Sequence, residues 1–473
     1  MSTITSALKG TVIDQVLRLA TSDNQKSILL AAQLARKITP AHRQTEIGWM
    51  IEQLSEETPI LQIARHVGRD LNPRARKALI QGFVVNGLMQ SSGKRAAFTK
   101  RTGAHAPLAL LISPTMRCNL ACDGCYAGAY SPDEELAPEM LQSIVEQANA
   151  IGVSIFTILG GEPFLRPDLL DLAARNPDSY FQVYTNGTLL TDAVIERLAR
   201  LGNVAPMLSL EGDRDYTDAR RGEGVYDLIM TTMDKLGRAG LAFGYSATVM
   251  RRNFRDVTSP EFVDALVARG AMIGWNFLYM PVGREPDMSL MLTPEERNEF
   301  REAVLKVRRT RPLFAIDFWG DSLLVGGCIA AKWYLHITSE GWVEPCVFAH
   351  FATHNIKCST LEEAITSPFF TEIRRRQPFN HNLLMPCMLI DNPRHSREIV
   401  AQTGARPTHP GAEAMLGALA PQIDHYAAEV DRLYSQVWPC ISHDPRDAWD
   451  GEHPRTGAEQ TRKQAALSGA SHH

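Results

Sequence analysis

The chain has 473 residues, of which 44% are hydrophobic and 22% are charged. These proportions are typical of soluble globular domains, and they exclude a disordered or fibrous protein. The formal net charge of −4 is too small to predict a polyanionic partner, so we expect no nucleic-acid binding. Neither an export signal nor an apolar run long enough to cross a membrane is found in the sequence. We therefore expect a cytoplasmic protein without a transmembrane segment.

Residues 1–104 are predicted to form a helical N-terminal region. Ile28, Leu29 and Ala32 fall roughly on one helical face, and Ala78 and Phe83 take similar positions in a later helix. This stretch carries no chemical motif, and it lacks the alternating strands of a leader-peptide recognition domain.

Residues 105–320 alternate short apolar runs with amphipathic segments, which is the pattern of repeated βα units. Right-handed crossovers would make the strands parallel and place the helices outside them. The sequence therefore predicts an α/β fold built on a partial (β/α)6 barrel, whose binding groups gather at the carboxyl ends of the strands. The predicted strands are 107–113, 154–159, 180–185, 205–210, 241–249 and 272–280.

Residues 321–449 are predicted to form a small C-terminal α+β domain, which follows one more helix at 293–310 and one more strand at 313–319. Segments 333–338 and 342–347 flank a Ser-Glu-Gly turn and predict a hairpin. Ser359 and Glu362 have the spacing of a capping box, which predicts a helix that ends near Arg375. Residues 450–473 contain few apolar residues and are expected to be disordered.

Three cysteines, Cys118, Cys122 and Cys125, crowd together directly after the first predicted strand. Three thiolates can each bind one iron of a [4Fe-4S] cluster and leave the fourth iron without a protein ligand. A structural zinc site usually takes four ligands, and free thiols or chance spacing are the remaining alternatives. The spacing favours an iron–sulfur cluster at the active end of the predicted barrel.

Residues 117–125 resemble a known signature. Their Cys-x3-Cys-x2-Cys spacing, in an Arg-Cys-Asn-Leu context, resembles that of the radical S-adenosylmethionine (SAM) superfamily, and the resemblance covers roughly residues 105–400. It implies that a [4Fe-4S] cluster on Cys118, Cys122 and Cys125 cleaves SAM to a 5′-deoxyadenosyl radical, which activates a C–H bond of a substrate. It also implies an electron donor such as flavodoxin or ferredoxin. The sequence departs from the family at Gly124, where an aromatic residue usually helps to hold adenine. Some members that act on lipid or isoprenoid substrates resemble this chain in having glycine there.

Polar and glycine-rich motifs follow three further predicted strands at the same end of the barrel. Two glycines let the backbone approach a ligand, and a carboxylate can accept a hydrogen bond from an ammonium group. Each motif also fits an ordinary turn into the next helix. By resemblance to the family, these motifs are expected to contact the methionyl and ribose groups of SAM. The expected SAM-binding residues are Gly160, Gly161, Glu162, Pro163, Thr185, Asn186, Ser209 and Glu211, with Tyr279 as a candidate wall for adenine.

Three further cysteines, Cys328, Cys346 and Cys387, lie in the C-terminal region. Gly341 precedes Cys346 in a Gly-x4-Cys pattern that resembles the SPASM and twitch extensions of radical SAM enzymes, which carry auxiliary iron–sulfur clusters. A full SPASM pattern includes a dense cysteine block that is absent here, so we expect at most one auxiliary cluster. Three buried free thiols are the alternative, because cysteine is among the most buried residue types. The candidates for a fourth ligand are Cys358, Cys440, His350, His354 and Asp391, or none of them.

The sequence leaves three interpretations of the activity open. Auxiliary-cluster domains of this type resemble those of enzymes that modify ribosomally made peptides, which makes a peptide the first candidate substrate. A lipid, isoprenoid or other small molecule is the competitor, with Phe83, Val84 and Val85 as apolar contacts. A non-catalytic iron–sulfur protein is the third interpretation, and the lack of a fourth ligand beside the cysteine triplet argues against it.

Overall fold

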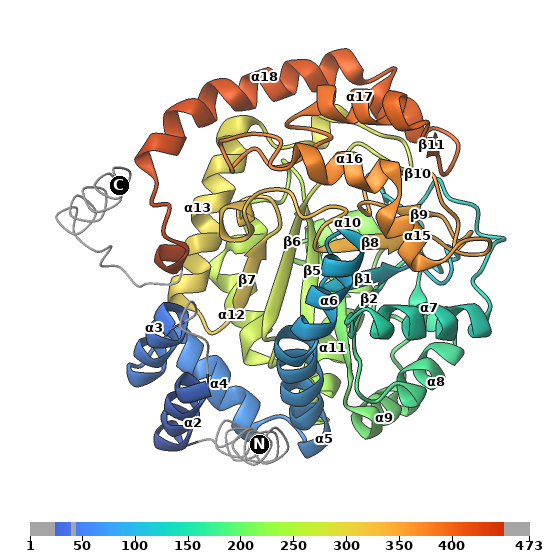
Figure 1. Ribbon diagram of the computed structural model, residues 1–473. Coiled ribbons are helices and arrows are strands. Elements are labelled where there is room, and N and C mark those ends of the chain that lie inside the picture. The colour runs from blue at the N-terminus through green and yellow to red at the C-terminus, as the bar shows by residue number, and fades with distance from the viewer. Residues whose placement is uncertain (1–23, 39–43, 449–473) are drawn as a thin grey trace, which may run out of the picture.

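The described part of the chain comprises residues 24–38 and 44–448. In this computed structural model, a nine-stranded sheet forms the centre of the molecule and helices lie around it (Figure 1). The strand order is β7-β6-β5-β4-β3-β2-β1-β8-β9. The strands are β1 (Ala109–Ile112), β2 (Ile155–Ile158), β3 (Tyr180–Thr185), β4 (Val204–Ser209), β5 (Gly244–Val249), β6 (Ile273–Leu278), β7 (Phe314–Asp317), β8 (Tyr334–Ile337) and β9 (Val343–Glu344).

Strands β1 to β7 are parallel, and each pairs with the next one along the chain. This confirms the predicted partial (β/α)6 barrel, to which β7 adds one more parallel strand. The register places Ala109, Ile155 and Tyr180 side by side at the amino ends of their strands. The helices of this part are α7 (Pro138–Ala150), η3 (Pro163–Leu165), α8 (Asp168–Arg175), α9 (Asp192–Leu201), α10 (Arg214–Arg221), α11 (Val225–Arg238), η4 (Asp256–Thr258), α12 (Pro260–Ala268), η5 (Met288–Leu290) and α13 (Pro294–Thr310).

Local sequence signals set the ends of these helices. Thr293 and Glu296 form a capping box at the start of α13, and Pro294 takes its first helical position. Helix α9 ends at Gly202, whose φ of 79° suits a residue without a Cβ atom. All four residues of β2 are buried because packed helices and the barrel interior cover both faces of the strand.

The N-terminal region is helical, as predicted, and part of it packs against the amino end of the barrel. Its elements are α2 (Gln25–Ile38), α3 (Gln44–Ser55), α4 (Pro59–Arg69), α5 (Pro73–Lys77), the π-type helix η2 (Ala78–Gln90) and α6 (Ser92–Thr102). A Cβ atom on Gly87 would lie 2.7 Å from the Ile155 side chain, and the Phe83 ring lies 5.5 Å from that of Tyr180. Because Ile155 and Tyr180 begin β2 and β3, η2 packs against the amino end of the barrel.

The C-terminal region forms the predicted hairpin and extends the central sheet. Strands β8 and β9 pair antiparallel, and β8 also pairs with β1 in parallel. The remaining elements are α14 (Ser322–Val325), β10 (Phe351–Ala352), α15 (Leu361–Thr366), α16 (Pro368–Arg376), α17 (Pro393–Thr403), β11 (Arg406–Pro407), η6 (Ala412–Leu416), α18 (Ala420–Val437), η7 (Trp438–Cys440) and η8 (Pro445–Ala448). The predicted tail at 450–473 lies outside the described residues. Among the described residues, no helix is long and apolar enough to cross a membrane.

The predicted helix from Ser359 to about Arg375 is wrong in two respects. The capping box forms one residue later, between Thr360 and Glu363, because the Ser359 hydroxyl donates to the carbonyl of Asn355 instead. The helix is also divided in two, since Pro368 begins α16 and cannot continue the hydrogen bonding of α15.

Candidate active site

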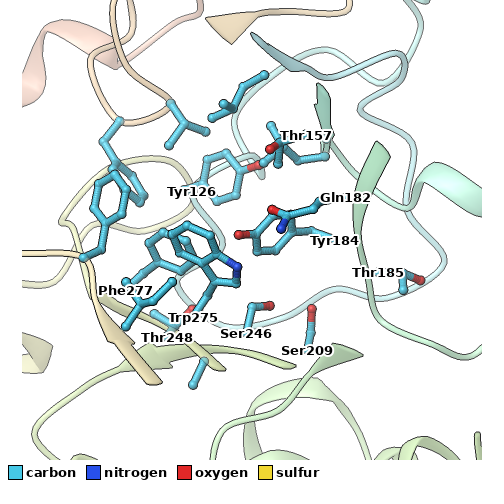
Figure 2. Close-up of a pocket in the computed structure, with 18 of the residues that line it drawn as sticks. Tyr126, Thr157, Gln182, Tyr184, Thr185, Ser209, Ser246, Thr248, Trp275 and Phe277 are labelled. Atoms are coloured by element: carbon cyan, nitrogen blue, oxygen red, sulfur yellow. The ribbon is translucent and has the colours of Figure 1, made fainter. Parts of the chain in front are cut away.

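A cavity of about 620 Å³ lies inside the barrel. Its lining combines the three cysteines of the loop after β1 with residues from every strand from β1 to β7. Figure 2 shows Gln182, Tyr184, Trp275 and Phe277 reaching toward its centre, with Tyr126 opposite. Of the predicted SAM-binding residues, five line this cavity: Gly160, Gly161, Thr185, Asn186 and Ser209.

Hydrogen-bond donors surround the cysteine triplet. The Asn186 side chain lies 3.9 Å from the Cys118 sulfur, and Arg221 lies 3.9 Å from the Cys122 sulfur. Burial and the negative charges of Glu162 and the other two cysteines raise the pKa of Cys118. Metal binding would therefore have to displace a proton from this thiol.

A [4Fe-4S] cluster and a single metal ion place different demands on the cysteine triplet. Within residues 24–38 and 44–448, no group of three or more His, Cys, Asp or Glu side chains gathers around one metal ion. A structural zinc site would need such convergence. In a cubane cluster each cysteine binds a different iron, so the three sulfurs need not converge on one point.

The glycines after β2 allow the strand end to contact the base of the cysteine loop. A Cβ atom on Gly160 would lie 2.2 Å from the carbonyl oxygen of Thr115. A Cβ atom on Gly161 would lie 2.0 Å from the carbonyl oxygen of Arg117. The N–H of Gly161 donates to the Thr115 carbonyl at 3.0 Å, which ties the two segments together. Only glycine leaves room for this approach, so the pair fixes the loop that carries the cysteines.

Glu162 lies behind the cavity and does not line it. Its fully buried carboxylate accepts hydrogen bonds from the N–H of Phe164 at 3.0 Å, the Thr185 hydroxyl at 2.8 Å and the N–H of Asn186 at 2.8 Å. Burial raises the pKa of Glu162, and these three donors oppose the rise. Pro163 is also buried and occupies the first position of η3. This carboxylate thus joins the end of β2 to the end of β3.

Glu211, at the end of β4, has a similar environment and also lies outside the cavity lining. Its buried carboxylate binds the guanidinium groups of Arg220 and Arg221 and accepts a hydrogen bond from the N–H of Thr248 at 3.0 Å. Both arginines line the cavity. The sequence analysis did not identify these arginines, and the available signal was an Arg-Arg pair that follows Ser209 and Glu211 closely in the sequence.

Tyr279, at the end of β6, occupies the space beside Gly124. A Cβ atom on Gly124, whose φ is +60°, would lie 2.8 Å from the Tyr279 ring. The loop that follows also contacts the cysteine loop, since the Arg284 N–H donates to the Cys125 carbonyl at 3.0 Å. The ring that follows β6 thus lies beside the glycine that precedes the third cysteine.

The C-terminal cysteines lie around Tyr334. The Tyr334 hydroxyl donates to the Cys346 sulfur at 2.8 Å, and its ring lines the cavity. Burial raises the pKa of Cys328 to about 12 and also raises the pKa values of Cys346 and Cys387. The charges of all three cysteines contribute to a pKa of Tyr334 well above its usual value, after the larger effect of burial.

The candidate fourth ligands differ in their surroundings. Asp391 accepts a hydrogen bond from the Cys387 N–H at 3.0 Å, but its carboxylate also binds Arg297. His350 is hydrogen-bonded to His409, and His354 to the Thr353 hydroxyl. Cys358 and Cys440 are exposed. Asp391 therefore contacts the backbone of Cys387 while Arg297 occupies its carboxylate.

A buried polar cluster connects the two cysteine-bearing regions. Glu344, two residues before Cys346, accepts a hydrogen bond from the hydroxyl of Tyr130 at 2.7 Å and lies 2.7 Å from a ring nitrogen of His336. The other ring nitrogen of His336 lies 2.8 Å from the Ser113 hydroxyl. Tyr130 follows the cysteine triplet and Ser113 follows β1, so this cluster joins the barrel to β8 and β9.

The comparisons with known proteins agree with this geometry. The radical SAM superfamily matches residues 112–258. Mycofactocin maturase MftC of Mycobacterium tuberculosis is 32% identical over 294 residues, which cover 58% of this chain and 74% of that protein. The chain therefore belongs to the radical SAM superfamily. As a radical SAM enzyme it uses SAM and a [4Fe-4S] cluster.

Two further proteins are similar to this chain. The AdoMet-dependent heme synthase of Methanosarcina barkeri is 26% identical over 284 residues, which cover 54% of this chain and 80% of that protein. The crystal structure of Streptococcus suis SuiB bound to SAM matches with a TM-score of 0.54 at 21% identity, covering 63% of this chain and 76% of SuiB. The match to SuiB shows a shared fold.

Proposed function

We propose that this radical SAM enzyme binds its SAM-cleaving cluster through Cys118, Cys122 and Cys125. The observation that carries the proposal is that these cysteines line one cavity together with the ends of β2, β3 and β4. Asn186 and Arg221 add donors beside two of the sulfurs, where they would stabilise thiolate charge. A reduced flavodoxin or ferredoxin is the proposed electron donor.

The residues of the chain bind and orient SAM. When bound, the cluster and SAM supply the reductive cleavage that starts radical chemistry on a C–H bond. Asn186 and Ser209 offer hydrogen-bonding side chains to the polar groups of SAM. We assign positioning roles to Glu162 and Glu211, because Glu162 holds the backbone of Asn186 and Glu211 holds Arg221. This assignment differs from the expectation from the family resemblance, in which both carboxylates contact SAM directly.

We further propose that Cys328, Cys346 and Cys387 hold one auxiliary iron–sulfur cluster. The Tyr334 hydroxyl donates to the Cys346 sulfur at 2.8 Å, and burial raises the pKa of each of the three thiols, which favours the protonated form in the absence of metal. Metal binding would release those protons and couple the cluster to the folding of this region.

The cavity favours an apolar substrate. Its wall on β6 and the segments that follow is largely aromatic, with Trp275, Phe277, Phe318 and Phe348 (Figure 2 labels the first two). A peptide is the second candidate, because MftC is named a maturase and SuiB has been solved bound to the precursor peptide SuiA.

Anaerobic incubation of the iron-loaded protein with SAM and dithionite tests the proposal. We expect 5′-deoxyadenosine and methionine to form, and replacement of Cys118 by alanine to abolish both. The exposed Cys358→Ala variant is the matched control and should retain the activity. Absence of both products from the wild-type protein would overturn the proposed function.

A further inference from the structure

The cavity extends beyond the SAM site along the length of the barrel. Its lining includes residues from both ends of the same strands, such as Ile155 and Gly160 around β2, and Ile273 and Met280 around β6. A six-residue strand spans roughly 17 Å. The half nearest the amino ends of the strands is lined mainly by apolar side chains, among them Phe83, Leu88, Ala109, Ile155, Ile273 and Trp333.

The amino end of the cavity reaches the protein surface at η2. Leu88 lines the cavity and is nevertheless 38% exposed, and Val84 and Met89 on the same helix are 37% and 45% exposed. Helices of the π type are rare and frequently occur at functional sites. Leu88 thus borders the cavity on the side opposite the cysteines, and Val84 and Met89 are exposed on the same helix; we call these three apolar residues the η2 mouth.

Positive charge flanks this mouth. Residues 58–104 contain nine Lys and Arg residues and one acidic residue, Asp70, although the whole chain has a net charge of −4. Arg65, Arg69 and Arg101 pair with carboxylates. In the part of the chain that the structure describes, the other six show no ion pair with a carboxylate, and five of them lie just before or after η2: Arg74, Arg76, Lys77, Lys94 and Arg95.

We propose that the amino half of the cavity binds a long hydrocarbon chain, which enters through the η2 mouth from an anionic membrane surface. This inference rests on the proposed function, because the same cavity must hold SAM at its other end. Apolar side chains surrounded by basic residues are the features that bind a protein to anionic lipids. With C–C bonds of about 1.5 Å, an extended chain of roughly a dozen carbons would reach from the mouth to the cysteines.

A hydrocarbon chain fits these walls better than a peptide does. Each peptide unit carries an N–H and a C=O group that need hydrogen-bond partners when buried. Apart from the indole N–H of Trp333, which is buried without a partner in the described part of the chain, the amino half of the cavity offers apolar side chains, so a threaded peptide would bury many unpaired polar groups at a high cost. Polar side chains such as Gln182 and Ser246 lie farther along the barrel and leave room for a polar substituent nearer SAM.

Vesicle sedimentation tests the membrane contact. The intact protein should bind vesicles of equal parts phosphatidylcholine and phosphatidylglycerol about tenfold more tightly than vesicles of phosphatidylcholine, and high salt should remove the difference. The Val84→Glu, Leu88→Glu double variant should lose this binding. Leu228→Glu, at a residue that is 43% exposed on α11, is the matched control and should bind as the wild type does. Equal binding to both vesicles, or stronger binding to a short RNA duplex, would overturn the inference.

Displacement of a fluorescent long-chain fatty acid, cis-parinaric acid, tests the cavity. Saturated fatty acids should displace it with an affinity that rises about fourfold per methylene until the chain fills the cavity. Ala109→Trp, which fills the amino half, should abolish binding of the probe while SAM binding in equilibrium dialysis is retained. Leu88→Glu, at the exposed rim, should also weaken binding of the probe. It serves as the second variant if Ala109→Trp does not fold. A protein that cleaves SAM but does not bind the fatty acid contradicts this inference alone, whereas loss of SAM cleavage contradicts the proposed function.

Discussion

Glu162 and Glu211 contribute to the site without facing its cavity. Each follows a strand of the barrel, is fully or almost fully buried, and accepts hydrogen bonds from groups on a different segment. A buried carboxylate is stable only when donors of this kind compensate for its lost hydration. The two glutamates therefore provide buried hydrogen-bond acceptors that connect neighbouring segments.

Replacing Glu162 by glutamine should weaken SAM binding without removing iron. The amide nitrogen would replace the oxygen that accepts from the Asn186 N–H, so two donors would face each other at 2.8 Å. We expect a loss of about 1–3 kcal/mol in the free energy of unfolding, and weaker SAM binding as Asn186 shifts. Denaturant unfolding, equilibrium dialysis with SAM and iron analysis measure the three effects. Loss of iron together with SAM binding would instead assign Glu162 to the support of the cysteine loop.

Replacing Tyr334 by phenylalanine should lower the reduction potential of the proposed auxiliary cluster. The Tyr334 hydroxyl donates to the Cys346 sulfur, and donors to cluster sulfurs stabilise the more negative, reduced state. Loss of one hydrogen bond to a charged acceptor should shift the potential by roughly tens of millivolts. Potentiometric titration followed by electron paramagnetic resonance measures the shift. Tyr184→Phe, another tyrosine of the cavity lining, is the control and should leave this potential unchanged.

At the scale of elements, the strand ends supply some residues of the candidate site, and loops and helices supply others. The strand ends supply Thr185 and Ser209, whereas the cysteines come from the loop after β1 and Arg221 comes from the end of α10. Strand positions could be predicted from the sequence because apolar runs and turns set them locally. The arginines could not, because their role depends on the contact of α10 with the cysteine loop, which no local pattern encodes.

Asp317, at the end of β7, should make stability depend on pH. Burial and the nearby charge of Asp321 raise the pKa of Asp317 to about 6 from a usual value of 3.8. Because the folded state then binds the proton more tightly than the unfolded state, stability should fall as pH rises from about 4 to about 6, by up to about 3 kcal/mol. The Asp317→Asn variant keeps an acceptor for the Trp319 N–H and should lack this dependence.

Denaturant unfolding of both proteins at several pH values measures the effect of Asp317. The exposed Asp215→Asn variant is the control, and its stability should follow that of the wild type across the range. Parallel stability curves for Asp317→Asn and the wild type between pH 4 and 6 would show that Asp317 titrates normally.

At the scale of the whole molecule, the sequence predicts the barrel and two groups of cysteines. It does not predict how the hairpin and the N-terminal helices pack against the barrel. The hairpin at 333–347 was predicted, yet its pairing with β1 depends on long-range contacts such as Ile112 beside Ile337. The same holds for η2, whose composition predicts a helix, whereas its place at the amino end of the barrel depends on the fit of Gly87 against Ile155. Local periodicity determines elements, and shape complementarity between distant segments determines how they close a cavity.

The iron content of the intact protein should report both groups of cysteines. Three cysteines in each group complete one cluster each and cannot serve two, so we expect about eight irons per chain. A variant with alanine at 118, 122 and 125 should keep about four irons and lose all SAM cleavage. A variant with alanine at 328, 346 and 387 should also keep about four, and its C-terminal region should unfold more readily because metal binding is coupled to folding there.

Alanine at both exposed cysteines, Cys358 and Cys440, is the matched control and should leave the iron content unchanged. Iron analysis and Mössbauer spectroscopy of all four proteins distinguish the two sites, because each triple variant isolates one cluster. A folded, monodisperse 118/122/125 variant without iron would leave Cys328, Cys346 and Cys387 as buried thiols. A 328/346/387 variant with a full complement of iron would assign all the iron to the barrel, and Tyr334 would then line the cavity without a cluster beside it.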